Sequence, residues 1–252
     1  AVLLRAQRRL RDEPVAEALG KMRTLADRAD REEALETLRG LEGQAAALYF
    51  GVFGKVVGVP EFPFGGRSRR PPRDAVNACL SFGYVVLGAI VETEVLRAGL
   101  DPMLGFFHQP RFGRPSLMLD LLEEFRPAVD GLVLRLIHRR QLASSDFVRR
   151  GGPTLDEILA EAPADAAEGN GGGEAGDAAE GGADAGTAAG EGVYLGDAGR
   201  RVFLSELFRR LRERARYAPR DAQLELRDVV REQAHRLARV IDGREQAYEC
   251  VA

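Results

Sequence analysis

Apolar residues recur every three or four positions along the first part of the chain, the spacing of an amphipathic helix. Helix-forming residues dominate from residue 1 to about residue 57. The clearest repeat consists of Ala34, Leu35, Leu38, Leu41, Ala45 and Leu48. This pattern predicts helices throughout the region.

Two segments rich in Pro and Gly interrupt the helical pattern. Residues 58–73 contain four prolines and predict a loop. Asp74 is a suitable N-cap for a long apolar helix that Gly99 closes. Residues 101–115 predict a second loop, which leads into another apolar helix that Pro127 kinks or interrupts.

Residues 161–192 differ sharply in composition from the rest of the chain. They contain eight acidic and no basic residues, with ten Gly and eleven Ala. Such a segment buries too little apolar surface to offset its ordering entropy, so we expect a disordered insertion. Two Arg-rich helices are expected after it, at about 196–216 and 219–241. Since no clear strand signal follows residue 57, the predicted fold class is mainly α.

The formal net charge of −3 at first argues against a nucleic-acid partner. However, the insertion carries eight of the negative charges, and the remainder of the chain has a net charge of +5, nearly all from arginine. A basic folded part favours a phosphate-bearing partner. The longest apolar stretch, residues 84–91, is too short to predict a membrane span. Cys79 and Cys250 are too few for a disulfide framework and fit a reducing cytoplasm.

Asp120 and Glu123 lie in an apolar helix three residues apart, which places both carboxylates on one face. Two interpretations remain open. The pair forms structural salt bridges with Arg111, Arg114 or Arg126, or it lies at a divalent cation, because carboxylate oxygens suit Mg²⁺ and Mn²⁺.

His108 and Glu42 are two further candidates for the same chemistry. His108 lies in the loop ahead of the acidic helix, where an imidazole would shift a carboxylate site toward Mn²⁺; its alternative is a packed or exposed side chain. Glu42 lies on an apolar helix face, where it is either a ligand or a capping or salt-bridge residue. His138 and His235 are interpreted as surface or core-edge residues.

The loop GGRSRRPPRDAVN offers a cluster of guanidinium groups next to Gly and Pro. Guanidinium pairs with phosphate in a bidentate fork, which suits a nucleic-acid backbone. A solvated basic turn explains this loop equally well. The candidate contacts here are Arg67, Arg69, Arg70 and Arg73, followed at helical spacing by Asn77 and Tyr84.

Four segments together resemble a known family in order and spacing. They are LEGQAAALYF, RSRRPPRDAVNACLSFGYVVL, GLDPMLGFFHQPRFGRPSLMLDLLEEFRP and LVLRLIHRRQ. The family is the integrase of CRISPR spacer acquisition, a CRISPR-associated endonuclease. The resemblance is close over about residues 32–142 and loose in the C-terminal helices.

The resemblance implies a helical catalytic domain that binds Mg²⁺ or Mn²⁺ through Glu42, His108 and Glu123, with Asp120 as a further acidic residue near the metal. It implies joining of a prespacer to the CRISPR repeat by attack of a 3′-hydroxyl on a phosphodiester, with water in its place giving nuclease activity. His108 would also exchange a proton with the leaving oxygen. Arg111 and Arg114 would join the 67–73 loop in contacting DNA.

Two departures from the family determine the predicted domain organisation: the N-terminal sequence is helical, and an acidic insertion interrupts the chain. Family members carry an N-terminal β-rich domain for dimerisation, yet only helical sequence precedes Glu42. We therefore expect leading helices at 1–31, and the catalytic domain at 32–160 and 193–252, split by the insertion at 161–192. The N-terminal β-rich domain would be largely absent.

The resemblance also implies partners and a location. The expected partners are double-stranded DNA, as prespacer and CRISPR repeat, and a small companion Cas adaptation protein. The full-length family forms homodimers, has no membrane span and acts in the prokaryotic cytoplasm. The competing hypothesis is a non-catalytic helical DNA-binding or assembly module of the same adaptation complex.

Overall fold

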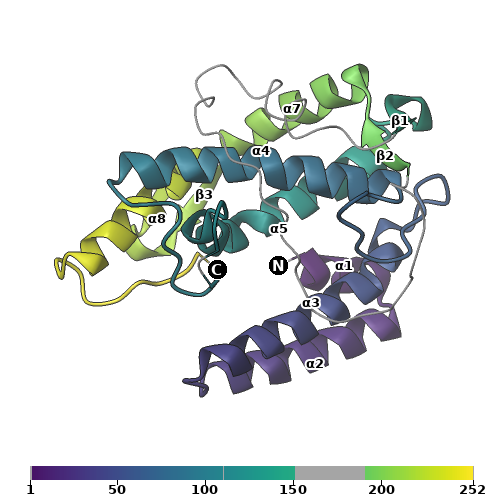
Figure 1. The fold of residues 1–252 in the computed structure, drawn as a ribbon. Helices are drawn as coiled ribbons and strands as arrows, with labels where there is room; N and C mark the ends of the chain where they lie inside the picture. Colours follow the sequence, from purple (N-terminus) through teal and green to yellow (C-terminus); the bar gives the residue numbers. More distant parts are fainter. Residues whose placement is uncertain (1, 110, 151–190, 252) are drawn as a thin grey trace. The chain divides into compact units, whose positions relative to one another are not determined.

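The structure, a computed structural model, describes residues 2–109, 111–150 and 191–251 (Figure 1). The chain divides into two compact units. Of the described residues, the first unit contains 2–79, 133–150 and 191–196, and the second contains the rest. Most of the predicted insertion lies outside the described residues. The predicted domain bounds stay predictions.

Three helices open the first unit: α1 (Val2–Leu10), α2 (Glu13–Ala29) and α3 (Leu35–Val57). The Asp12 side chain caps α2 by accepting the Val15 N–H at 3.1 Å. α2 and α3 lie side by side (Figure 1) and bury apolar residues from both helices, among them Val15, Leu41 and Phe53. The helices predicted before residue 57 are confirmed.

The predicted loop after α3 packs tightly against that helix. α3 ends at Gly58, whose φ of 57° is left-handed. A Cβ on Gly54 would lie 2.7 Å from the Phe64 carbonyl oxygen, so the close approach of the loop requires glycine. The ring of Phe64 also contacts Phe53, with centroids 5.4 Å apart. This packing holds the Arg-rich loop that follows.

α4 (Ala75–Arg97) and α5 (Ser116–His138) each contribute residues to both units. Asp74 caps α4 as predicted, since its Oδ1 accepts the Asn77 N–H at 2.8 Å. In the second unit, a Cβ on Gly83 would lie 2.5 Å from Val129 Cγ1 of α5. The missing side chain therefore lets α4 pack directly against α5. Pro127 lies inside α5, which continues past it, so an interruption there is wrong.

α4 is the one helix of the described part that is long and apolar enough to cross a membrane. Half of its most apolar stretch is nevertheless buried inside the protein. Length and composition alone are weak evidence for a span, and this burial suits a core helix.

The remaining elements are short, apart from α7 (Asp197–Leu211) and α8 (Leu226–Ile241). Strand β1 (Phe147–Arg150) pairs antiparallel with β2 (Gly192–Leu195) in the first unit. In the second unit β3 (Arg214–Tyr217) pairs antiparallel with β4 (Ala222–Glu225) and contacts α8. Single 3-10 turns occupy Ser144–Asp146 and Ala218–Arg220.

The fold is mainly α, as predicted, but the expectation of no strands after residue 57 is wrong. The helix predicted at 196–216 ends before the β3–β4 hairpin, and the helix predicted at 219–241 begins after it. Asp221 provides the left-handed turn residue, with φ of 46°. Tyr217 is buried, and its hydroxyl donates to Gln233 Oε1 at 2.7 Å. This tertiary contact, which no local pattern reveals, accompanies the hairpin.

Candidate functional site

A compact loop places His108 immediately before α5. The Leu117 N–H at the start of the helix donates to the Pro102 carbonyl at 2.8 Å, which ties the two ends of the loop together. A Cβ on Gly105 would lie 2.7 Å from Ser116 Cβ and 2.8 Å from Asp120 Oδ2. Glycine is therefore required where the loop crosses α5.

Asp120 holds this loop through four hydrogen bonds to one carboxylate. Its Oδ2 accepts the Phe106 N–H at 2.7 Å and the Phe107 N–H at 2.9 Å. Its Oδ1 accepts the His108 N–H at 2.9 Å and lies 2.6 Å from the ring nitrogen Nδ1 of His108. The Asp120 side chain is fully buried, whereas the His108 ring is partly accessible. One buried carboxylate thus fixes both the backbone and the ring of His108.

The electrostatics of this contact determine which ring nitrogen of His108 is available. Burial raises the pKa of Asp120, but the hydrogen bonds from His108 and the three backbone N–H groups lower it by more, so the net pKa lies below its ordinary value. An ionised carboxylate can only accept, so Nδ1 of His108 must donate. In the neutral ring, Nε2 then carries the lone pair. This is the tautomer that a metal-binding histidine needs.

Glu123 lies one turn after Asp120 on α5. Its Oε1 is 2.9 Å from Arg126 Nη2, and its side chain is 30% exposed. The salt-bridge interpretation is thus correct for Glu123 and Arg126, whereas Asp120 is engaged by His108 and backbone groups.

Glu42 is exposed on α3 in the first unit, while His108, Asp120 and Glu123 belong to the second unit. Within the described part of the chain, no ion pair of the Glu42 carboxylate is found. No group of three His, Cys, Asp or Glu residues forms a ready metal cluster among the described residues. The assignment of Glu42, His108 and Glu123 as common ligands stays a prediction.

A nitrogen donor of fixed tautomer is nevertheless chemically compatible with a divalent cation. The donor set of one imidazole and carboxylate oxygens suits Mn²⁺ and Mg²⁺. The buried carboxylate that holds His108 is the partner that metal-bound histidines usually have. The local chemistry therefore fits the expected metal.

Asn77 organises the Arg-rich loop of the first unit. This side chain is fully buried; its Oδ1 accepts from Arg67 Nη1 at 2.8 Å and from the Ser68 N–H at 2.9 Å. Its Nδ2 donates to the Gly66 carbonyl at 2.8 Å and to the N-cap Asp74 at 2.7 Å. The sequence predicted that Asn77 contacts DNA directly. In the structure its side chain is buried and shapes the loop that carries the arginines.

The other predicted DNA contacts differ in accessibility. Tyr84 is half-buried, and the Cζ atom of Arg126 lies 5.1 Å from the centroid of the Tyr84 ring. Its hydroxyl donates to Asp130, so Tyr84 contributes to the packing of α4 on α5. The exposed arginines among the predicted contacts are Arg69, Arg70, Arg73 and Arg111, whereas Arg67 and Arg114 are half-buried.

Glu124, the residue next to Glu123, was not singled out from the sequence. Its Oε2 accepts the Val251 N–H and Gln233 Nε2, each at 2.8 Å, and its Oε1 accepts the Tyr248 hydroxyl. Burial and the Glu124 carboxylate raise the pKa of Tyr248, which keeps the phenol protonated as a donor. The C-terminal segment is thereby fastened to α5 one residue from Glu123. Two adjacent glutamates in a sequence do not reveal that one pairs with Arg126 and the other binds the C-terminal segment.

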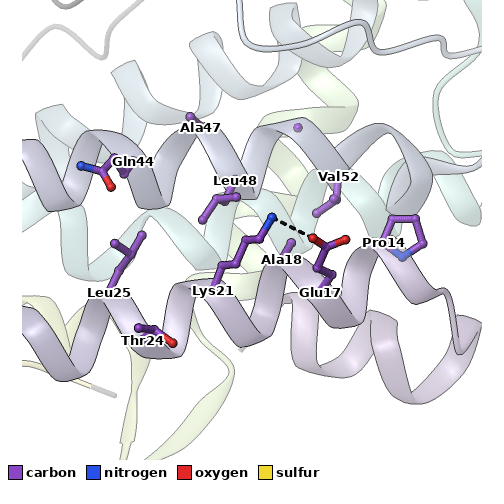
Figure 2. A pocket seen from close by; sticks show the side chains of 11 residues that line it. Pro14, Glu17, Ala18, Lys21, Thr24, Leu25, Gln44, Ala47, Leu48 and Val52 are labelled. Atoms are coloured by element: carbon purple, nitrogen blue, oxygen red, sulfur yellow. Dashed lines mark ion pairs between the residues drawn. The ribbon is translucent and has the colours of Figure 1, made fainter.

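A separate cavity of about 740 Å³ lies between α2 and α3 (Figure 2). Its lining is mostly apolar, with Leu25, Leu48 and Val52. The Glu17–Lys21 ion pair, 2.7 Å long, is drawn with the lining side chains in Figure 2. The lining holds no histidine and no catalytic candidate.

Comparison with known proteins identifies close sequence relatives. The family model described as CRISPR associated protein Cas1 matches residues 1–161. A protein named CRISPR-associated endonuclease Cas1 2, from Rhodospirillum rubrum, is 51% identical over 165 residues, which is 60% of this chain and 47% of the relative. The chain spans 37–47% of the length of three of the curated relatives that it matches.

Solved structures share the fold. A casposase bound to its integration product matches 99% of this chain and 58% of its own, with a TM-score of 0.71 and 22% identity. A partial Cas6-RT-Cas1–Cas2 complex matches 100% of this chain and 65% of its own, with a TM-score of 0.69 and 20% identity. Because these sequence identities are only 20–22%, the similarity to these two structures shows a shared fold.

Proposed function

Because the chain belongs to the CRISPR-associated protein Cas1 family, we propose that it forms the helical DNA- and metal-binding part of an endonuclease and integrase. The reaction inserts short DNA fragments into a CRISPR array in the prokaryotic cytoplasm. The observation that carries this proposal is the Asp120–His108 contact, because it orients an imidazole for metal binding.

Glu42, His108 and Glu123 would hold Mg²⁺ or Mn²⁺. The cation would supply Lewis-acid polarisation of the phosphodiester and stabilise charge on the attacking and leaving oxygens. Asp120 fixes the ring of His108 and the backbone on its N-terminal side, so the site needs little reorganisation. Arg126 limits the movement of Glu123 through their ion pair.

The chemistry is a phosphodiester transesterification. A terminal 3′-hydroxyl of the DNA fragment attacks phosphorus in the repeat, a new P–O bond forms, and the bond to the leaving 3′-oxygen breaks. The hydroxyl proton is lost, and the leaving oxygen gains a proton. Water in place of the hydroxyl gives hydrolysis. The exposed arginines of the 67–73 loop would bind phosphates.

The companion is proposed to be a small Cas adaptation protein, with double-stranded DNA as substrate. The Cas1 parts of complexes whose names include Cas2 support this choice through their shared fold. The complete protein is proposed to work as a homodimer.

A strand-transfer assay tests the proposal. The whole protein, with its companion, is incubated with a labelled DNA fragment, repeat DNA and Mn²⁺. We expect joined product from the wild type and a loss of at least about 100-fold in Glu42→Ala and His108→Ala, because each removes a ligand.

Glu36→Ala, on the same helix as Glu42, and His235→Ala are the matched controls and should retain activity. If the wild type binds the repeat but joins nothing, the chain acts as a non-catalytic DNA-binding module. If both ligand variants remain fully active, the metal assignment is wrong.

A further inference from the structure

Phe112 is more exposed than any other large apolar side chain in the described part of the protein, at 93%. It lies at the tip of a tight turn between Arg111 and Arg114, whose backbones form an antiparallel bridge. Burying a phenylalanine is worth roughly 1.5–3 kcal/mol, so a fully exposed ring is available to a partner.

The turn that carries Phe112 is ordered by its own hydrogen bonds. The Arg114 N–H donates to the Arg111 carbonyl at 3.1 Å. Gly113 has a φ of 70°, a left-handed conformation that glycine adopts without strain. The ring is therefore presented by a defined turn.

The Arg114 end of this turn is tied through Ser116 to Gln109, the residue after His108. The Ser116 hydroxyl, which is buried, lies 3.2 Å from the Gln109 carbonyl oxygen and 3.4 Å from that of Arg114. Phe112 is four positions after His108 in the sequence, so their Cα atoms lie within roughly 14 Å of each other. At 3.4 Å per base step, this is a reach of about four base pairs.

The charge around Phe112 favours nucleic acid over an apolar protein surface. Arg111 and Arg114 flank Phe112 in the sequence, and guanidinium groups bind the phosphates of a nucleic-acid backbone. An apolar side chain between such contacts is the arrangement that wedges between base steps or stacks on an unpaired base.

We propose that Phe112 binds a nucleobase of the target DNA close to the reacting phosphodiester, while Arg111 and Arg114 hold the neighbouring phosphates. This inference rests on the proposed function for the identity of the DNA. It adds a base-binding site beside the metal ligands. The ring unstacks the base and so orients the phosphodiester toward His108.

Fluorescence of 2-aminopurine tests the wedge directly. The probe replaces single bases within four pairs of the reacting bond in repeat DNA, and the whole protein is added with its companion and Ca²⁺ to suppress strand transfer. We expect fluorescence to rise at one or two positions with the wild type, and no rise with Phe112→Ala. Loss of stacking should also weaken DNA binding by roughly tenfold.

Three variants complete the experiment. Phe112→Tyr should restore the signal, and Phe208→Ala, an exposed phenylalanine on α7, should leave it unchanged. Because the Phe112 ring is exposed, Phe112→Ala should melt at the wild-type temperature. Its loss of affinity should be the same at every salt concentration, since it removes no charge.

The experiment distinguishes failure of the base-binding inference from failure of the proposed function. If the wild type joins DNA strands but Phe112→Ala gives the same fluorescence as the wild type, the wedge is wrong and the proposed function stands. If Phe112→Ala loses activity without any change in fluorescence, the ring serves a protein contact and the wedge is again wrong. His108→Ala should retain the fluorescence rise while it loses strand transfer.

Discussion

At the scale of single residues, neighbouring carboxylates on α5 have different roles because their donors differ. Asp120 is saturated by the His108 ring and three backbone N–H groups. Glu123 pairs with Arg126 and remains partly exposed, whereas Glu124 fastens the C-terminal segment. In the proposed site, Asp120 is therefore a positioning residue that acts through His108.

Replacing Asp120 by asparagine should destabilise the protein in a pH-dependent way. Because the pKa of Asp120 is lowered in the folded state, its contribution is fully present above the unfolded value of about 3.9 and is lost as the pH falls through the folded value. We expect Asp120→Asn to lose about 2 kcal/mol of unfolding free energy at pH 7. Denaturant unfolding at several pH values measures the difference.

The same comparison has an internal control. Glu17→Gln removes one partner of an exposed ion pair on α2 and should leave the unfolding free energy nearly unchanged. If the gap between the wild type and Asp120→Asn stays constant from pH 7 down to about pH 3, the carboxylate is not stabilised in its ionised form.

The sequence identified candidate residues on and before α5, and Arg126 as a salt-bridge partner of its carboxylates, but it did not predict the contact between Asp120 and His108. The spacing of Asp120 and Glu123 indicated one helix face, and His108 lay in the loop just before it. The contact between Asp120 and His108 depends on the backbone path of the loop, which Gly105 permits by its close approach to α5. Residue type and spacing do not encode that path.

At the scale of elements, glycines decide how α3 packs. A Cβ on Gly51 would meet nothing within 4 Å, whereas one on Gly54 would lie 2.7 Å from the Phe64 carbonyl oxygen. Gly51→Ala should therefore stabilise the protein by about 0.5–1 kcal/mol through helix propensity. Gly54→Ala should destabilise it by about 1–3 kcal/mol by displacing the loop.

Thermal and denaturant unfolding of the two variants measures these opposite effects. Since both positions lie on one helix three residues apart, they serve as controls for each other. Equal effects of the two substitutions would contradict the packing of the 58–74 loop on α3.

Helices were predictable from the sequence because their periodicity and caps are local, as Asp74 and Gly99 show at the two ends of α4. The β3–β4 hairpin was not, because each of its strands is only four residues long and β3 contains two arginines. Its buried Tyr217 bonds to Gln233 of α8, which is a tertiary contact. Of the two outcomes expected at Pro127, the interruption is wrong, since α5 continues through this residue.

At the scale of the whole molecule, the charge distribution agrees with a DNA-binding role. The acidic segment at 161–192 masks the basic character of the rest of the chain in the overall charge of −3. Exposed arginines lie in the 67–73 loop and beside Phe112.

The central claim is that Asp120 fixes His108 so that its Nε2 binds a divalent cation. Pulsed electron paramagnetic resonance of the Mn²⁺-loaded protein tests it most directly, because a coordinated imidazole nitrogen modulates the Mn²⁺ electron-spin echo. We predict nitrogen modulation in the wild type and its loss in His108→Gln, with His235→Gln unchanged. Modulation that persists in His108→Gln, or Mn²⁺ bound to the wild type without any nitrogen signal, would contradict the claim.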